Sequence, residues 1–157
     1  MTLVLRPQSQ RISHDPDNGH WGDCFRTAVA VCLGRDAEEV PHVMHDPKKH
    51  SDSAVDRLRD WLRPQGLGFC QTIYHAETEI GKILEATAHL SPGIPFVLSG
   101  LSPRGPYGHC VVICDGEVCC DPATGSAVPD PEKALAGALD DWWWLECVVK
   151  LPDQTGN

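Results

Sequence analysis

Residues 22–34 read Gly22-Asp23-Cys24-Phe25-Arg26-Thr27-Ala28-Val29-Ala30-Val31-Cys32-Leu33-Gly34 and predict a short buried helix. Small or apolar residues recur along one helical face, at Phe25, Ala28, Val29, Cys32 and Leu33. Asp23 suits the N-cap, and Gly34 suits the left-handed residue that ends many helices. Cys24 then lies in the first turn, where free backbone N–H groups and the helix dipole favour a thiolate. The segment therefore predicts a nucleophilic cysteine at a helix start.

A nucleophilic cysteine needs a base, and the best candidate lies far downstream. Two β-prone runs, 109–113 and 117–121, are joined through residues 114–116, which read Cys-Asp-Gly. Asp-Gly between apolar strands is typical of a β-hairpin. His109 begins the first run and Asp121 ends the second, so the hairpin can bring an imidazole and a carboxylate together.

Two registers of this hairpin are possible. A two-residue turn pairs Cys114 with Glu117 and places His109 opposite Pro122 instead of Asp121, unless a bulge shifts the register. A three-residue loop pairs Ile113 with Glu117 and places His109 directly opposite Asp121, on the same face. We expect the three-residue loop, because it lets the carboxylate hold the imidazole in one tautomer.

The other segments alternate between helical and strand patterns, which predicts an α+β fold in a single domain, 1–157. Short helices are predicted at 37–40, 53–63, 78–90 and 131–139. Strands are predicted at 69–74, 94–98 and 142–151, with a short strand or arm at 3–5. Exposed loops are predicted at 42–51, 99–108 and 123–131. We interpret the run of three tryptophans at 142–144 as core packing rather than ligand stacking.

Length and charge restrict the class of protein. A chain of 157 residues fits one domain with a real core. The net charge is −9 and basic residues form no run, which argues against a nucleic-acid partner. No apolar run approaches the roughly 18 residues needed to span a bilayer, and the N-terminus does not resemble a signal peptide. We therefore expect a cytoplasmic protein without a membrane span.

Eight cysteines raise the question of disulfides and of zinc. Most of them lie among valine, isoleucine, alanine and leucine, where reduced cysteine behaves as a small apolar residue. A structural zinc site is the main alternative, since His109 and four cysteines crowd the hairpin. Strand alternation, however, sends Cys119 to the face opposite Cys110, Cys114 and Cys120. We therefore expect reduced cysteines, no metal and no cofactor.

Acyl-transfer chemistry also needs groups that stabilise an oxyanion and hold the substrate. The Cys24 backbone N–H is one oxyanion donor, and the Asn18 side-chain amide, six residues upstream, is the candidate for the second. Residues flanking the two motifs are candidates for substrate binding: His20, Trp21, Gly22, Tyr107 and Gly108.

These motifs resemble the papain-like cysteine peptidases, and most of all the bacterial branch that removes leader peptides during bacteriocin export. The matching segments are Asn18, Asp23-Cys24, Gly108-His109-Cys110-Val111-Val112 and Asp121-Pro122-Ala123-Thr124-Gly125. In that family the upstream amide is usually glutamine. The chain is also similar to small bacterial and phage proteins with Gly-x-Cys helices, in the segments 38–41 (Glu-Glu-Val-Pro) and 102–105 (Ser-Pro-Arg-Gly).

The resemblance implies a papain-like α+β fold, in which an N-terminal helical part carrying Cys24 packs on a small antiparallel sheet. It implies a Cys24–His109–Asp121 triad that hydrolyses an amide or peptide bond, or an ester or isopeptide bond, without a cofactor. The substrate would be a peptide, a protein or a small amide. Two other readings stay open: an acyl transferase, deamidase or ligase with the same thioester step, and a binding module that keeps the fold without turnover.

Overall fold

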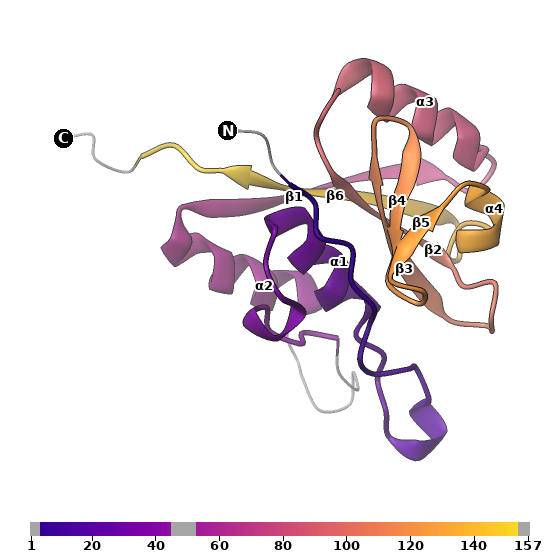
Figure 1. Ribbon diagram of the computed structural model, residues 1–157, viewed down its shortest axis with the longest axis horizontal. Helices are drawn as coiled ribbons and strands as arrows, with labels where there is room; N and C mark the ends of the chain where they lie inside the picture. The colour runs from indigo at the N-terminus through magenta and orange to yellow at the C-terminus, as the bar shows by residue number, and fades with distance from the viewer. Residues whose placement is uncertain (1–3, 45–52, 154–157) are drawn as a thin grey trace.

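The computed structural model describes residues 4–44 and 53–153, and in them six strands form one antiparallel sheet in the order β1-β6-β2-β3-β4-β5 (Figure 1). The strands are β1 (Leu67–His75), β2 (Phe96–Leu101), β3 (Gly108–Cys114), β4 (Glu117–Asp121), β5 (Ser126–Val128) and β6 (Trp142–Lys150). The α-helices are α1 (Cys24–Leu33), α2 (Ala54–Leu62), α3 (Ile80–Leu90) and α4 (Pro131–Ala134). Three 3₁₀ turns are η1 (Pro16–Asn18), η2 (Ala37–Glu39) and η3 (Arg63–Gln65). The predicted α+β class is confirmed.

Helices cover both faces of the sheet, α1 and α2 on one face and α3 and α4 on the other (Figure 1). Side chains of a strand alternate between faces. Val97 and Val112 accordingly pack in the core cluster with α1 and α2, whereas Leu98 and Val111 pack with α3 and α4. The face that carries α1 also holds the candidate site.

Helix α1 begins at Cys24 and ends before Gly34, whose φ of 65° is left-handed, as predicted. The sequence pattern predicts one apolar stripe, but the helix is buried almost all round. Its buried residues are Phe25, Thr27, Ala28, Val29, Ala30, Val31 and Cys32. A helix without a polar face is stable only inside the fold, so the backbone of Cys24 is held by packing on several sides.

Most other predicted elements are present, with shifted ends. The predicted helix at 131–139 stops at Ala134, and β5 lies inside the predicted loop at 123–131. Residues 4–5 form an arm rather than a strand, and most of the predicted loop at 42–51 lies outside the described residues. No helix in 4–44 or 53–153 is long and apolar enough to cross a bilayer.

The β3–β4 turn differs from the predicted one. Asp115 (φ 50°) and Gly116 (φ 85°) form a two-residue turn, and Cys114 pairs with Glu117. The expected pairing of Ile113 with Glu117 is therefore wrong. Two consecutive residues with positive φ match the twist of the flanking strands, which favours this tight turn over a longer loop.

A β-bulge then changes the register. Val112 pairs with Cys120 instead of the residue that the turn alone would place there, so Cys119 is the extra residue. A bulge bends and twists its strand. The prediction that His109 lies directly opposite Asp121 is therefore wrong, but the bulge shifts the carboxylate into reach of the imidazole.

Candidate active site

A cavity of about 590 Å³ opens beside the first turn of α1, on the α1 side of the sheet. Cys24 and His109 both line it, although 85 positions separate them in the sequence. Strand residues from β1, β2, β3 and β6 form its floor, and the N-terminal arm and the 104–108 segment form its rim.

His109 and Asp121 form a buried hydrogen-bonded pair. His109 Nε2 lies 2.7 Å from Asp121 Oδ1, and both side chains are almost fully buried. Burial works against a charged imidazole, but the bond to Asp121 and the interaction with Cys24 raise the pKa of His109 to about 9. With Nε2 bound to Asp121, Nδ1 is the nitrogen left for the thiol. The imidazole is therefore oriented and protonated at neutral pH.

Asp121 is held ionised from several directions. Burial favours its neutral form, yet hydrogen bonds from His109 and from the Ala123 backbone N–H keep its pKa lowered. The Arg104 guanidinium lies 3.7 Å from its second carboxylate oxygen and adds to this lowering. A carboxylate that accepts such bonds is a fixed orienting group for the histidine.

The Cys24 thiol is partly exposed, and its pKa lies well below the ordinary value. Hydrogen bonding with Cys110 is the largest cause, burial opposes it, and His109 lowers the pKa through a hydrogen bond and its positive charge. A thiolate beside an imidazolium at a helix start is the reactive state of a nucleophilic cysteine.

Cys110 is a buried second thiol beside the first, which the sequence interpretation treats only as core packing or a zinc ligand. Its contact with Cys24 raises its own pKa, and burial raises it further. Its Sγ also lies 3.2 Å from Ser99 Oγ on β2. We assign the thiolate to Cys24, because Cys24 alone of the two begins a helix and interacts with His109.

Asp23 occupies the predicted N-cap position, but its side chain does not cap the helix. This fully buried carboxylate accepts hydrogen bonds from the backbone N–H groups of Arg11 (3.0 Å) and Ile12 (2.8 Å), and it pairs with Arg26. Asp23 thereby ties the N-terminal arm to the first turn of α1. The arm also binds the turn after β4, since the Gln10 N–H donates to the Pro122 carbonyl at 2.6 Å.

Of the five predicted substrate-binding residues, four line the cavity: Trp21, Gly22, Tyr107 and Gly108. The His14 ring contacts both Trp21 and Tyr107, with ring centroids 5.4 Å and 4.7 Å apart, and so joins the two sides of the rim. His20, the fifth residue, is exposed and pairs with Asp15 outside the cavity lining.

Asn18 does not meet its predicted role. It ends η1 on an exposed loop, and its amide donates to Asp15 Oδ2 at 2.7 Å. Local hydrogen bonding thus holds the amide in its own turn, away from the cavity lining. Gln10 instead presents a side-chain amide to the cavity. Its Nε2 donates one N–H to the Ile12 carbonyl at 3.3 Å and has a second N–H to donate, while its oxygen has no hydrogen-bond partner among the described residues.

The core interpretation of the tryptophan run holds for one residue of three: Trp142 is 39% exposed and outside the cavity lining, and Trp144 lines the cavity. Trp143 is buried, which confirms the core interpretation for that residue. Trp144 is 37% exposed and lines the cavity, on the same face as Glu146 two residues later. Sequence alternation at 142–147 could have indicated that Trp144 and Glu146 share a face, but not that this face meets Cys24.

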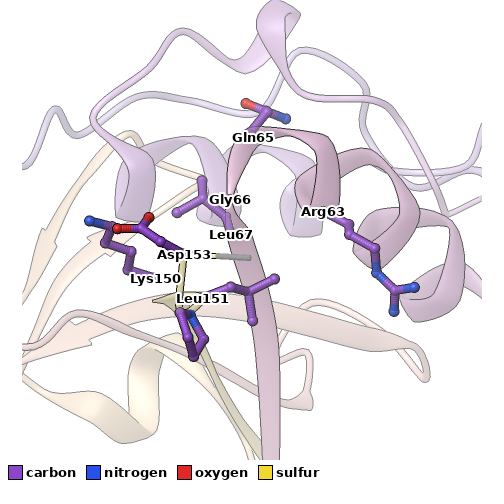
Figure 2. Close-up of a pocket in the computed structure, with 8 residues that line it drawn as sticks. Arg63, Gln65, Gly66, Leu67, Lys150, Leu151 and Asp153 are labelled. Carbon is purple, nitrogen blue, oxygen red and sulfur yellow. The ribbon is translucent and has the colours of Figure 1, made fainter. Parts of the chain in front are cut away.

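A second cavity, of about 700 Å³, lies where the segment after α2 meets the end of β6 (Figure 2). Figure 2 shows Lys150 beside Asp153, and Arg63 pointing away from both. Its described lining contains no cysteine and no histidine. In the described ranges, moreover, no three His, Cys, Asp or Glu residues are arranged to hold a metal ion.

Comparison of the chain with protein-family models, with curated proteins and with solved structures finds no match.

Proposed function

We propose that the protein is a thiol-dependent hydrolase of amide or peptide bonds, with Cys24, His109 and Asp121 as its catalytic triad. One observation carries the proposal: a helix-start cysteine with a lowered pKa meets a histidine that a buried aspartate orients at 2.7 Å. The arrangement of a helical part on an antiparallel sheet supports a papain-like fold.

Each residue of the proposed triad, and each oxyanion donor, has a role in the hydrolysis. The Cys24 thiolate forms a bond to the carbonyl carbon, and the oxyanion that results is near the free N–H groups of the first turn of α1. The Gln10 amide is our candidate for the second donor. His109 gives its proton to the leaving amine as the C–N bond breaks, which leaves a thioester. His109 then takes a proton from water, whose oxygen displaces the Cys24 thiolate and releases the acid.

A peptide library provides the direct test. Wild-type protein, a Cys24→Ala variant and a Cys70→Ala control are incubated with the library, and products are identified by mass spectrometry. Cys70 is exposed and outside the cavity lining, so its variant should cleave like wild type. The proposal expects cleavage that Cys24→Ala abolishes. Equal product formation by Cys24→Ala would contradict it.

A further inference from the structure

Glu146 is a buried acid on the floor of the same cavity, and the triad does not use it. Its side chain is 4% exposed. Oε1 accepts a hydrogen bond from Gln71 Nε2 at 2.6 Å, whereas Oε2 has no hydrogen-bond partner in the described part of the chain. Burying a carboxylate oxygen without a hydrogen bond costs free energy, and a ligand that donates a hydrogen bond to Oε2 would remove that cost.

The carboxylate is also held in one orientation. The Gln71 amide oxygen accepts from Arg59 of α2 at 3.2 Å, and the Gln71 amide nitrogen donates to Glu146. Gln71 therefore cannot turn to pair with Oε2 without losing one of these bonds. Arg59 is outside the cavity lining, so its charge acts on Glu146 from behind.

Strand pairing gives the path from the thiol to this acid. Cys110 pairs with Ser99, and Ser99 pairs with Trp144, so these side chains share one face. Glu146 lies two residues further along β6 on that face. From strand spacing and rise, the Cα atoms of Cys110 and Glu146 are about 12 Å apart. The side chains of Cys110 and Glu146 both extend from this face into the cavity, and the charge of Glu146 acts on the Cys110 thiol, so the acid is closer to the thiols than the two Cα atoms are to each other.

The walls between them are apolar or aromatic, with Phe25, Met44, Val55 and Trp144 in the lining. Such walls suit an alkyl stem, and the ring faces also attract cations. Arg104 is the only basic Lys or Arg side chain in the described lining, and it pairs with Asp121 at the other end. The cavity therefore offers an acceptor for a positive group, since neither nearby cation, Arg59 behind Gln71 or the His109 imidazolium beside Cys24, is hydrogen-bonded to the Glu146 carboxylate.

We propose that Glu146 is a specificity-determining residue: it binds a cationic group, an ammonium or guanidinium, that the substrate carries on an apolar stem. This inference rests on the proposed function for the link to catalysis. The binding site itself does not depend on turnover, so the two can be tested separately.

Binding is measured by NMR titration of the Cys24→Ala protein with n-pentylammonium and with n-pentanol, its uncharged counterpart. An ion pair between Glu146 and the ammonium, in a cavity largely shielded from solvent, predicts that n-pentylammonium binds about tenfold more tightly than n-pentanol. Glu146→Gln should remove the preference, and a control substitution of the exposed Glu117 at the start of β4, Glu117→Gln, should keep it. Equal affinity for the two probes, or a preference that survives Glu146→Gln, would overturn the proposal.

A pH series on the Cys24→Ala protein gives a check that needs no change at Glu146. The groups that act on Glu146 are Gln71 and Arg59, and its charge in turn acts on Cys110. Burial raises the pKa of Glu146 to about 7. The ammonium preference should therefore be large at about pH 8 and lost at about pH 5. A preference independent of pH would also overturn the assignment.

Alkylation of Cys24 links the subsite to the thiol. In otherwise wild-type protein, N-aminobutyl chloroacetamide should label Cys24 about tenfold faster than N-pentyl chloroacetamide, and Glu146→Gln should equalise the rates. Equal rates in wild type would show that the acid does not serve substrates of Cys24. A thiol inert to both probes would refute the proposed function, while the ammonium titration would still decide the binding site.

Discussion

Glu146→Gln should make the protein more stable at neutral and alkaline pH, by an amount that the structure sets. Burial raises the pKa of this acid from 4.5 to about 7. Between those values the native state binds more protons than the unfolded state, so its stability falls as the pH rises. The full loss is about 3 kcal/mol once Glu146 is ionised. Glutamine has no charge to bury and should escape this loss.

The assay is urea unfolding of both proteins at several pH values between about 5 and 8. Glu146→Gln should gain roughly 2 to 3 kcal/mol over wild type across this range. Because the pKa of His109 is raised from 6.5 to about 9, loss of its proton also lowers the stability as the pH rises through that range. Both proteins contain His109, so this effect cancels in the difference between them. Glu117→Gln, at the exposed first residue of β4, is the control. A difference that does not vary with pH would refute the burial of an ionisable Glu146.

Three other substitutions test the site. Asp121→Asn should lower the pKa of His109 from about 9 towards its ordinary 6.5, as followed by NMR of the imidazole, because the charged hydrogen bond is lost. Cys110→Ala should raise the pKa of Cys24, shifting the pH profile of its alkylation upward, because Cys110 is the largest cause of the lowering. Asp23→Ala should lower the free energy of unfolding by about 3 to 5 kcal/mol, measured in urea, because it leaves the largely buried Arg26 guanidinium without its ion pair. The same variant should speed tryptic cleavage of the arm, since the arm loses its bonds to Asp23.

The changes at Cys110 and Asp23 have matched controls. Cys114→Ala, at the exposed turn, should leave the alkylation profile of Cys24 in place, and Asp56→Asn, on the surface of α2, should leave the arm protected. An unchanged His109 pKa in Asp121→Asn would show that the 2.7 Å pair does not set it. An unshifted Cys24 profile in Cys110→Ala would remove the second thiol from the site.

The fold class and the two halves of the proposed triad could be predicted from local patterns. Helix α1 follows from its apolar spacing and from Gly34, and the β3–β4 hairpin follows from Asp115-Gly116. The register could not be predicted, because the bulge at Cys119 depends on packing between strands rather than on a sequence signal. The bulge makes the His109–Asp121 bond possible despite the tight turn.

The surroundings of the proposed triad depend on contacts that are distant in sequence. Asn18 has the right spacing from Cys24, but a bond to Asp15 keeps it in an exposed turn. Gln10 reaches the cavity instead, because Asp23 holds the arm by its backbone N–H groups. Glu146 reads as an ordinary polar residue of a terminal strand, and only the pairing of β6 with β2 places it in the cavity.

The most direct test of the central claim is the rate at which iodoacetamide alkylates Cys24 in the native protein at about pH 6, with exposed Cys70 as the internal reference. Peptide mass spectrometry gives both rates in one sample, for wild type and for His109→Ala. A thiolate held by the imidazolium predicts that Cys24 reacts at least about tenfold faster than Cys70, and that His109→Ala removes most of this advantage. If Cys24 reacts no faster than Cys70 in wild type, it is not an activated nucleophile and the proposed function is wrong.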